Sequence, residues 1–386
     1  MSVKSPRTVV EIARDDAELV PHVAAWDALA EQAIEPNIFF ESGALRAALR
    51  HMALPGPFCG VFVYRTAAAG AGGDRPARRL IAFVPFVLAR KGPRGMLRSY
   101  RLFTYFHCNL STPLVHCEHM DEALDALLAW MDTAPDGVRI FGLYTITGDG
   151  PLAVRLQARL AARRQPHLTE LSHERAFLRV GGSAREYLAS AIPAKKRKEL
   201  GRQRRRLEEL GKVTLVQPES EAETSAWLDR FLVLEAKGWK GRDGSAFNRT
   251  PDGRRFFLAF MDHFRARGRA ILLALRVEDR EIAMKCNLVA PDGVGAFSFK
   301  IAHDEAYARF SPGVLLEVDN VRYLHERAPG IAWMDSCAIP DHPMIDHVWR
   351  ERRRILYVMC CSRGLVGRAL LRLFRWRNGR WRATER

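Results

Sequence analysis

Residues 304–316 read DEAYARFSPGVLL, and the rest of the chain is predicted to fold around this stretch. Apolar residues dominate 281–289 and 295–301, which predicts two strands leading into it. The apolar spacing over residues 314–326 predicts a helix leading out of it. The stretch is therefore expected to be a strand-to-loop-to-helix connection.

The start of that helix has features of a binding site and of an ordinary cap. Ser311 is a good N-cap residue, because its hydroxyl can accept a backbone N–H of the first turn. Pro312 suits the first helical position, where its missing N–H costs nothing. Gly313 leaves the backbone bare for close approach, and Val314 follows it. Free N–H groups and the positive end of the helix dipole favour an anion here, although a plain capped helix explains the same residues.

Both halves of the chain alternate helices with antiparallel hairpins, which predicts a mixed α/β fold of α+β type. We expect an N-terminal lobe over residues 1–182, a C-terminal lobe over 183–362 and a basic amphipathic tail over 363–386. The 386 residues, 48% hydrophobic and 27% charged, are enough for two globular lobes.

The formal net charge of +16 predicts an anionic partner. Basic residues concentrate in residues 195–206 and from residue 350 onward. Coenzyme A, acyl-carrier protein, anionic lipid and nucleic acid all fit such charge. No recognition-helix or RNP-type motif is present, so we expect no sequence-specific nucleic-acid binding. The tail, with Trp376 among its arginines, is typical of a segment at an anionic membrane surface, or of a helix packed on the protein.

The cysteines and apolar runs predict a cytoplasmic protein, peripheral at most to the inner face of the membrane. Apolar runs such as 80–89 are too short to span a bilayer, and no signal peptide is apparent. Seven dispersed cysteines fit reduced thiols better than a disulfide framework. Cys108, His116, Cys117 and His119 lack the paired spacing of a zinc site, so no metal is expected.

Five segments in order carry a resemblance to a known family: KKRKELGRQRRRLEELG (195–211), the pair Trp239-Lys240, GRAILLALRVEDREIAMKCNLV (268–289), KIAHDEAYARFSPGVLL (300–316) and a strand containing Asp335. Together they resemble the CelD/BcsL-like acetyltransferases, a branch of the GNAT superfamily related to the Fem-type peptidyl transferases. The resemblance is strongest over residues 187–335. It implies tandem GNAT-like lobes with mixed, largely antiparallel sheets flanked by helices. The usual GNAT pyrophosphate signature is absent, and Phe310 stands where the family has Tyr.

The resemblance implies an N-acyltransferase that moves an acyl group, commonly acetyl, from acyl-CoA to an amine. An acceptor in polysaccharide or cell-envelope biosynthesis fits the family. The carboxylates Asp304 and Asp335, together with His342, are the candidate catalytic groups. Two of them have a structural alternative: loop capping or pairing with Arg309 for Asp304, and the polar cap of a helix that begins at Pro343 for His342.

Further residues are candidates for binding the two substrates. Ser311, Gly313, Val314 and Lys240 are expected to meet the anionic donor. Glu235 lies one turn before Lys240 and is expected to pair with it. Trp239, Lys196, Arg197 and Asp341 are expected to contact the acceptor. Two alternatives remain: a Fem-like transferase that uses aminoacyl-tRNA, and a non-catalytic GNAT-like scaffold at the membrane surface.

Overall fold

The structure is a computed structural model that describes residues 7–66, 78–91 and 97–384. Contacts divide the chain into two compact units. The first comprises Met1–Leu45, Ala53–His173 and Arg354–Arg386, and the second comprises Arg46–Met52 and Glu174–Arg353. The predicted lobe boundaries at residues 182 and 362 stay a prediction. None of the described helices combines the length and the apolar composition needed to cross a membrane.

The strands of the first unit pair in the order β1-β2-β3-β4-β6-β13-β7, with β5 on β3. The strands are β1 (Arg7–Ala13), β2 (Phe58–Thr66), β3 (Arg78–Lys91), β4 (Leu97–Leu102), β5 (Leu114–Val115), β6 (Ile140–Thr147), β7 (His167–Arg179) and β13 (Glu351–Cys361). The helices before β7 and after β13 are α1 (Asp16–Leu19), α2 (Val23–Glu31), α3 (Ser42–His51), α4 (Met120–Asp132), α5 (Pro151–Ala162) and α12 (Leu365–Thr384).

The strands of the second unit pair in the order β7-β12-β11-β10-β9-β8, so β7 contributes to both units. The strands after β7 are β8 (Val213–Val216), β9 (Ala270–Val277), β10 (Arg280–Val289), β11 (Gly295–His303) and β12 (Trp333–Asp335). The helices are α6 (Ala184–Ala191), α7 (Ala194–Glu208), α8 (Glu221–Lys237), α9 (Trp239–Asp243), α10 (Pro251–Arg265) and α11 (Pro312–Arg327). The β4–β6 and β11–β12 pairs are parallel and the other recorded pairs are antiparallel, which confirms the predicted mixed, largely antiparallel α/β fold.

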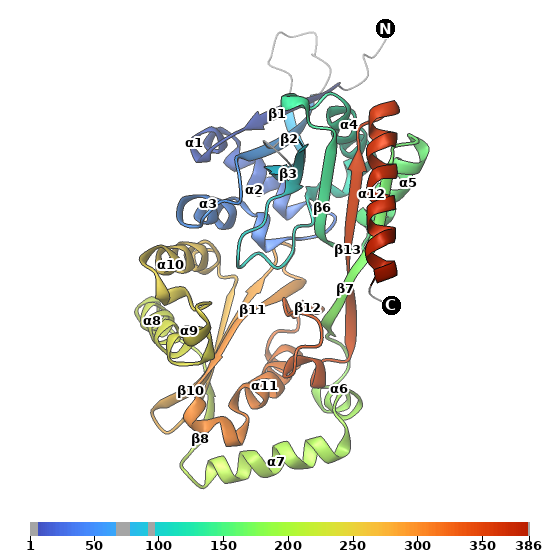
Figure 1. Ribbon diagram of the computed structural model, residues 1–386. Helices are drawn as coiled ribbons and strands as arrows, with labels where there is room; N and C mark the ends of the chain where they lie inside the picture. The colour runs from blue at the N-terminus through green and yellow to red at the C-terminus, as the bar shows by residue number, and fades with distance from the viewer. Residues whose placement is uncertain (1–6, 67–77, 92–96, 385–386) are drawn as a thin grey trace. The chain divides into compact units, whose positions relative to one another are not determined.

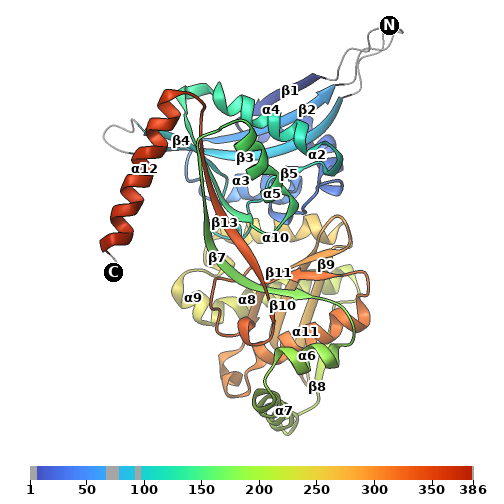
Figure 2. The ribbon, with the colours of Figure 1, turned by 90° about the vertical axis from the view of Figure 1, so that its right-hand side faces the viewer.

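Helices cover both faces of the sheet in the second unit (Figure 1). On one face α8 and α10 bring a phenylalanine cluster onto β11, where the Phe260 and Phe299 rings stack with centroids 4.7 Å apart. On the other face α11 packs against β9, β10 and β11, with Leu316 and Val321 fully buried. Figure 2 shows α6 and α7 beside α11, on the side of α11 that faces away from the strands.

A β-bulge in β11 changes which face its side chains reach. Strand β10 pairs with Ser298 and then with Lys300, so Phe299 is an extra residue in the ladder. In a regular strand residues 298 and 300 would share a face. Here Ser298 contacts Lys285 on the α11 side, whereas the Lys300 ammonium lies 4.9 Å from the ring centre of Phe247 on the α10 side. The bulge therefore places Lys300 on the face of α8 and α10.

The connection into α11 differs from its prediction at one residue. The helix begins at Pro312 as predicted, but the Ser311 hydroxyl makes no capping hydrogen bond. A 3-10 helix over Glu305–Phe310 ends directly before it, and Ser311 closes that helix in the left-handed conformation, with φ 52°. Its N–H bonds the carbonyl of Ala308. The predicted side-chain cap is wrong because Ser311 is needed as the end of the preceding turn.

The helix predicted to begin at Pro343 is also wrong. Only a 3-10 turn over Ile345–His347 forms there. Strand β13 begins at Glu351, so the segment is too short for an α-helix of ordinary length.

Candidate functional site

Strand β11 separates from β12 at the position of the bulge. The two strands pair only over residues 295–297 and 333–335, and β12 ends at Asp335. Strand β11 continues to His303, while Cys337 turns the chain with φ 52°. The edge of β11 beyond Phe297 is therefore not covered by β12. Such an edge offers backbone groups to an extended ligand.

Two lysines and a glutamate gather on the α8 side of this edge. The buried Glu235 accepts the N–H of Phe247 at 3.0 Å and lies 3.5 Å from the Lys240 ammonium. Lys240 also donates to the carbonyl of Ile301 in β11 at 2.6 Å. Burial lowers the pKa of Lys300 to about 8, and the neighbouring charge of Lys240 acts in the same direction. Lys300 is therefore an amine that changes protonation near neutral pH.

A fully buried ion pair lies on the α11 side. The Lys285 ammonium donates to a Glu317 carboxylate oxygen at 2.6 Å and to the Ser298 hydroxyl at 2.5 Å. Neither charged side chain is exposed at all. Two residues further along β10, the Asn287 amide donates to Asn320 at 2.8 Å. These polar contacts fix α11 on the sheet at a defined register.

The N-terminus of α11 is covered by side chains of this chain. A Cβ on Gly313 would lie 2.8 Å from the Met344 sulfur and 3.6 Å from the His303 ring, so a larger residue there would require the Met344 side chain to shift. His342 is nearby in sequence, and its Nδ1 accepts the N–H of Met344 at 3.3 Å. Burial lowers the pKa values of both histidines. Because Nδ1 of neutral His342 acts as an acceptor, its proton lies on Nε2, and the side chain can donate rather than accept there.

Asp335 does not project into an open cleft. It is fully buried, and one carboxylate oxygen accepts hydrogen bonds from Arg175 and Arg353, each at 2.8 Å. The other oxygen accepts the N–H of Cys337 at 2.8 Å. Burial alone would raise the pKa of Asp335, but the two guanidinium groups bring it below its usual value. This geometry favours an ion-pair role that joins β7, β12 and β13, and the predicted catalytic role stays a prediction.

The other predicted catalytic and donor-binding residues lie around α11. Asp304 caps the following 3-10 helix through the N–H of Ala306 and pairs with Arg280 at 2.6 Å, instead of pairing with Arg309. Val314 is half-buried in the first turn of α11, where it packs against the core. Both residues therefore have structural contacts of their own.

The predicted acceptor-binding residues are spread over separate surfaces. Lys196 pairs with Glu199 on α7, and Arg197 donates to the Ile192 carbonyl at the end of α6. Trp239 is half-exposed, and the centre of its ring lies 6.0 Å from the Lys240 ammonium. Asp341 is exposed in a turn with φ 54°. The structure does not bring these four side chains together, and their binding roles stay predictions.

Sequence reasoning missed Lys300, Lys285 and Glu317, although a signal was present. Each lysine stands among apolar neighbours inside a strand, and Glu317 stands inside the apolar face of a helix. Lys285 and Glu317 are fully buried and Lys300 is half-buried, and ionisable residues at buried positions are rare unless they are paired or functional. The predicted pairing of Lys240 with Glu235 is confirmed.

Three side chains of the first unit come close enough to suggest a metal site. The candidate ligand atoms of His116, Glu118 and His119 lie within 4.8 Å of one another. However, Nε2 of His116 contacts the Gln32 side chain at 2.6 Å and its Nδ1 accepts the N–H of Glu118. Both ring nitrogens already have partners, so this geometry does not favour a metal, and the predicted absence of one stays a prediction.

Comparison with known families matches residues 194–342 to the acetyltransferase (GNAT) domain. Comparison with curated proteins found no significant match. Among solved structures, FemX is similar with a TM-score of 0.54 and 12% identity, over 87% of this chain and 95% of FemX. The C-terminal domain of a putative lysylphosphatidylglycerol synthetase from Agrobacterium fabrum is similar with a TM-score of 0.50 and 14% identity, over 91% and 94% of the two chains. At such identities the likeness concerns the fold alone. The predicted resemblance is confirmed over residues 194–342, where the chain matches an acetyltransferase domain of the GNAT superfamily.

Proposed function

We propose that the second unit transfers an acyl group from acyl-CoA to an amine, at the edge of β11 beyond Phe297. The observation that carries the proposal is the coincidence of three features at this point: β12 ends, β11 has a bulge at Phe299, and Lys300 follows directly. An extended pantetheine chain can bond to a strand edge as an added strand would. The thioester carbonyl would then lie beside the bulge.

Lys300 is the group best placed for the chemistry. The acceptor nitrogen attacks the thioester carbon, forms a C–N bond, and leaves a negative charge on the carbonyl oxygen. When this intermediate collapses the C–S bond breaks, and coenzyme A leaves as a thiol after it takes up the acceptor's proton. We propose that the charged form of Lys300 stabilises the oxyanion, since a desolvated cation acts strongly on a developing charge.

A phosphate of the donor can bind at the N-terminus of α11 only if the Met344 side chain moves. The first turn of α11 presents backbone N–H groups and a positive dipole, as a phosphate requires. Met344 lies against Gly313 at this turn. A thioether side chain has three rotatable bonds and adapts readily, so it can move aside for a ligand. Lys240 lies at the same strand edge, but its contacts with Glu235 and Ile301 limit its reach.

The proposal is tested by binding and by turnover. Acetyl-CoA and longer acyl-CoA should bind in calorimetry, and free thiol should appear when a panel of amines is added. Lys300→Met should reduce kcat by about 10²–10³-fold while the chain stays folded. Lys212→Met, at an exposed lysine of the same unit, is the matched control. Absence of acyl-CoA binding at millimolar concentration would overturn the proposal.

The alternative is a Fem-like transferase that uses aminoacyl-tRNA. Helix α7 favours it, because Arg202, Arg205 and Arg206 are all exposed on it. Binding to phosphate backbones weakens steeply with salt, through release of counterions. Salt-sensitive tRNA binding without acyl-CoA binding would select this alternative. The third reading is a non-catalytic scaffold, which requires that Lys300→Met have no effect in cells while loss of α12 does.

We further propose that the acceptor belongs to cell-envelope or polysaccharide synthesis and that α12 touches an anionic membrane. The helix packs through Leu371 and Phe374, but four other apolar side chains are exposed: Leu365, Val366, Leu373 and Trp376. Three exposed arginines lie on the same helix: Arg368, Arg372 and Arg375. Apolar side chains beside arginines are typical of interfacial helices.

Vesicles containing phosphatidylglycerol test the membrane contact. They should sediment the protein at low salt, and Leu373→Glu should prevent it. Leu210→Glu, at a similarly exposed leucine of the second unit, should have no effect. An equal loss of vesicle binding in Leu373→Glu and Leu210→Glu would contradict the membrane role of α12.

A further inference from the structure

A cavity of about 560 Å³ lies between α6, α7 and α11 in the second unit. Its walls are mostly apolar and are formed by Ala184, Leu188, Ile192, Leu200, Leu315 and Val318. The volume lies within the range of about 300–1,000 Å³ that is usual for small-molecule sites. Apolar walls with a few polar groups are the usual composition of such sites.

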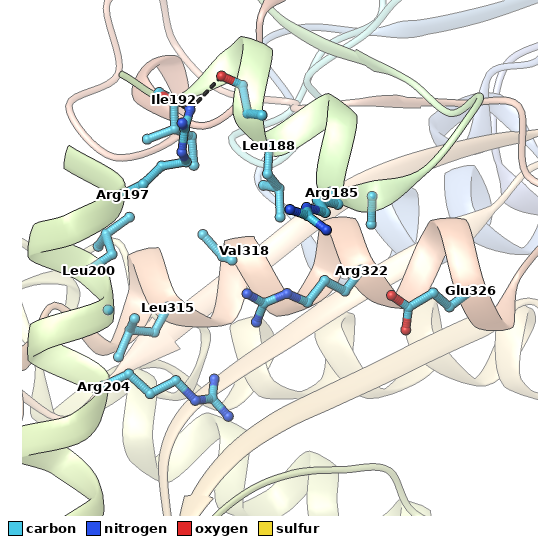
Figure 3. A pocket seen from close by; sticks show the side chains of 13 residues that line it. Arg185, Leu188, Ile192, Arg197, Leu200, Arg204, Leu315, Val318, Arg322 and Glu326 are labelled. Carbon is cyan, nitrogen blue, oxygen red and sulfur yellow. Dashed lines mark hydrogen bonds between the residues drawn. The ribbon is translucent and has the colours of Figure 1, made fainter. Parts of the chain in front are cut away.

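Arginines from all three helices line the same cavity. In Figure 3 the side chains of Arg185 and Arg322 extend into the space between the helices, and Arg204 approaches from α7. Arg204 and Arg322 share the carboxylate of Asp319, with distances of 2.6 and 2.8 Å. Within the described part of the chain, Arg185 has no recorded ion pair or hydrogen bond. Glu326 is the one carboxylate among the lining residues, so the cavity carries excess positive charge.

The cavity is separate from the proposed acyl-transfer site. Helix α11 turns Gly313, Glu317 and Asn320 toward His303 and β10, where they make the contacts described above. Leu315 and Val318 project from the opposite side of the helix into the cavity. Residues at these spacings lie on opposite faces of an α-helix. A ligand in the cavity would therefore contact α11 without touching Lys300 or the edge of β11.

We propose that this cavity binds an amphiphile with one hydrocarbon chain and an anionic head, either carboxylate or phosphate. The chain would lie against the leucine, isoleucine and valine side chains, which removes apolar surface from water. The head would bond to Arg185 and Arg322, because a guanidinium group binds carboxylate and phosphate oxygens in a bidentate manner. A nucleic acid or a purely ionic ligand would leave the apolar walls uncovered, and a neutral lipid would leave the arginines unused.

Gly201 provides a variant that fills the cavity. It lines the cavity from α7, and a Cβ built on it meets no atom within 4 Å. Leucine is a better helix former than glycine, so Gly201→Leu should fold with unchanged or slightly higher thermal stability. Its side chain would occupy the space of the hydrocarbon chain.

Calorimetry with the full chain tests the proposal, with each probe kept in monomeric solution. Laurate or dodecyl phosphate should bind, and dodecyltrimethylammonium should not. Gly201→Leu should abolish binding, and Arg185→Gln or Arg322→Gln should weaken it about tenfold or more. Arg206→Gln, at an exposed arginine of α7, should leave binding unchanged.

Several outcomes decide the matter. Binding of laurate alone identifies a carboxylate head and binding of dodecyl phosphate alone a phosphate head, and both support the proposal. Equal binding of the cationic probe, or binding that survives Gly201→Leu, overturns it. Lys300→Met should bind the probes as the unaltered chain does, so failure of the acyltransferase proposal would not affect this one.

Discussion

The buried pair Lys285–Glu317 makes a large and specific contribution that mutation can measure. Lys285→Met keeps most of the side-chain volume but removes the cation that the Glu317 carboxylate contacts at 2.6 Å. Both side chains are fully buried, so the carboxylate would stay in the interior without a counter-charge. Breaking a buried pair in this way costs about 3–5 kcal/mol. We expect Lys285→Met to lower the free energy of unfolding by that amount.

The double variant Lys285→Met/Glu317→Leu separates the pair from the packing. With both charges gone the Ser298 hydroxyl is the polar group left at the pair, and replacing a buried ion pair by apolar residues is often close to neutral. We therefore expect the double variant to recover most of the loss. Urea denaturation followed by circular dichroism of all three variants gives the coupling energy. A loss below about 1 kcal/mol for Lys285→Met, or no recovery in the double variant, would refute the reasoning.

Three further predictions follow from the site. Because the pKa of Lys300 is lowered to about 8, Lys300 loses its charge as pH rises from about 7 to 9, whereas an arginine at this position stays charged. The activity of the unaltered enzyme divided by that of Lys300→Arg should therefore fall over this pH range. A ratio that rises with pH would instead make Lys300 a base. Asp335→Asn removes the charge shared by Arg175 and Arg353 and should lower the free energy of unfolding by about 3–5 kcal/mol in denaturation experiments. Since the pKa of Asp335 is lowered in the folded protein, this stabilisation is present at neutral pH and is lost as pH falls below about 4. An equal loss at low pH would contradict the reasoning. Met344→Ala uncovers the first turn of α11 and should tighten acetyl-CoA binding in calorimetry, whereas weaker binding would mean that the sulfur contacts the ligand.

Local patterns were sufficient to predict the central strands and α11. The predicted strand 281–289 appears as Arg280–Val289, and the predicted helix 314–326 appears as Pro312–Arg327. Apolar spacing and Pro312 act within a few residues, so sequence alone reveals them. Ser311 was misassigned because its conformation depends on the 3-10 turn before it, which has no strong sequence signature.

The candidate site was only partly predictable because its contacts join distant elements. The Lys285–Glu317 pair connects residues 32 positions apart on a strand and a helix. Asp335 has the sequence position of a strand-end carboxylate, but Arg175, 160 positions away, donates a hydrogen bond to it. Such partners become apparent only when β7, β12 and α11 are placed in space.

The bulge at Phe299 makes the pairing of the strand, as well as residue type, decide what Lys300 can do. If β11 kept the same residues but paired regularly beyond Ser298, strict alternation would turn the Lys300 side chain toward α11 and Glu317. Two ammonium groups would then compete for one carboxylate, and the proposed site would lose its cation. Removal of Phe299 would instead leave Lys300 on its present face, so we expect relatives that lack the bulge to keep this lysine only where the strand is one residue shorter.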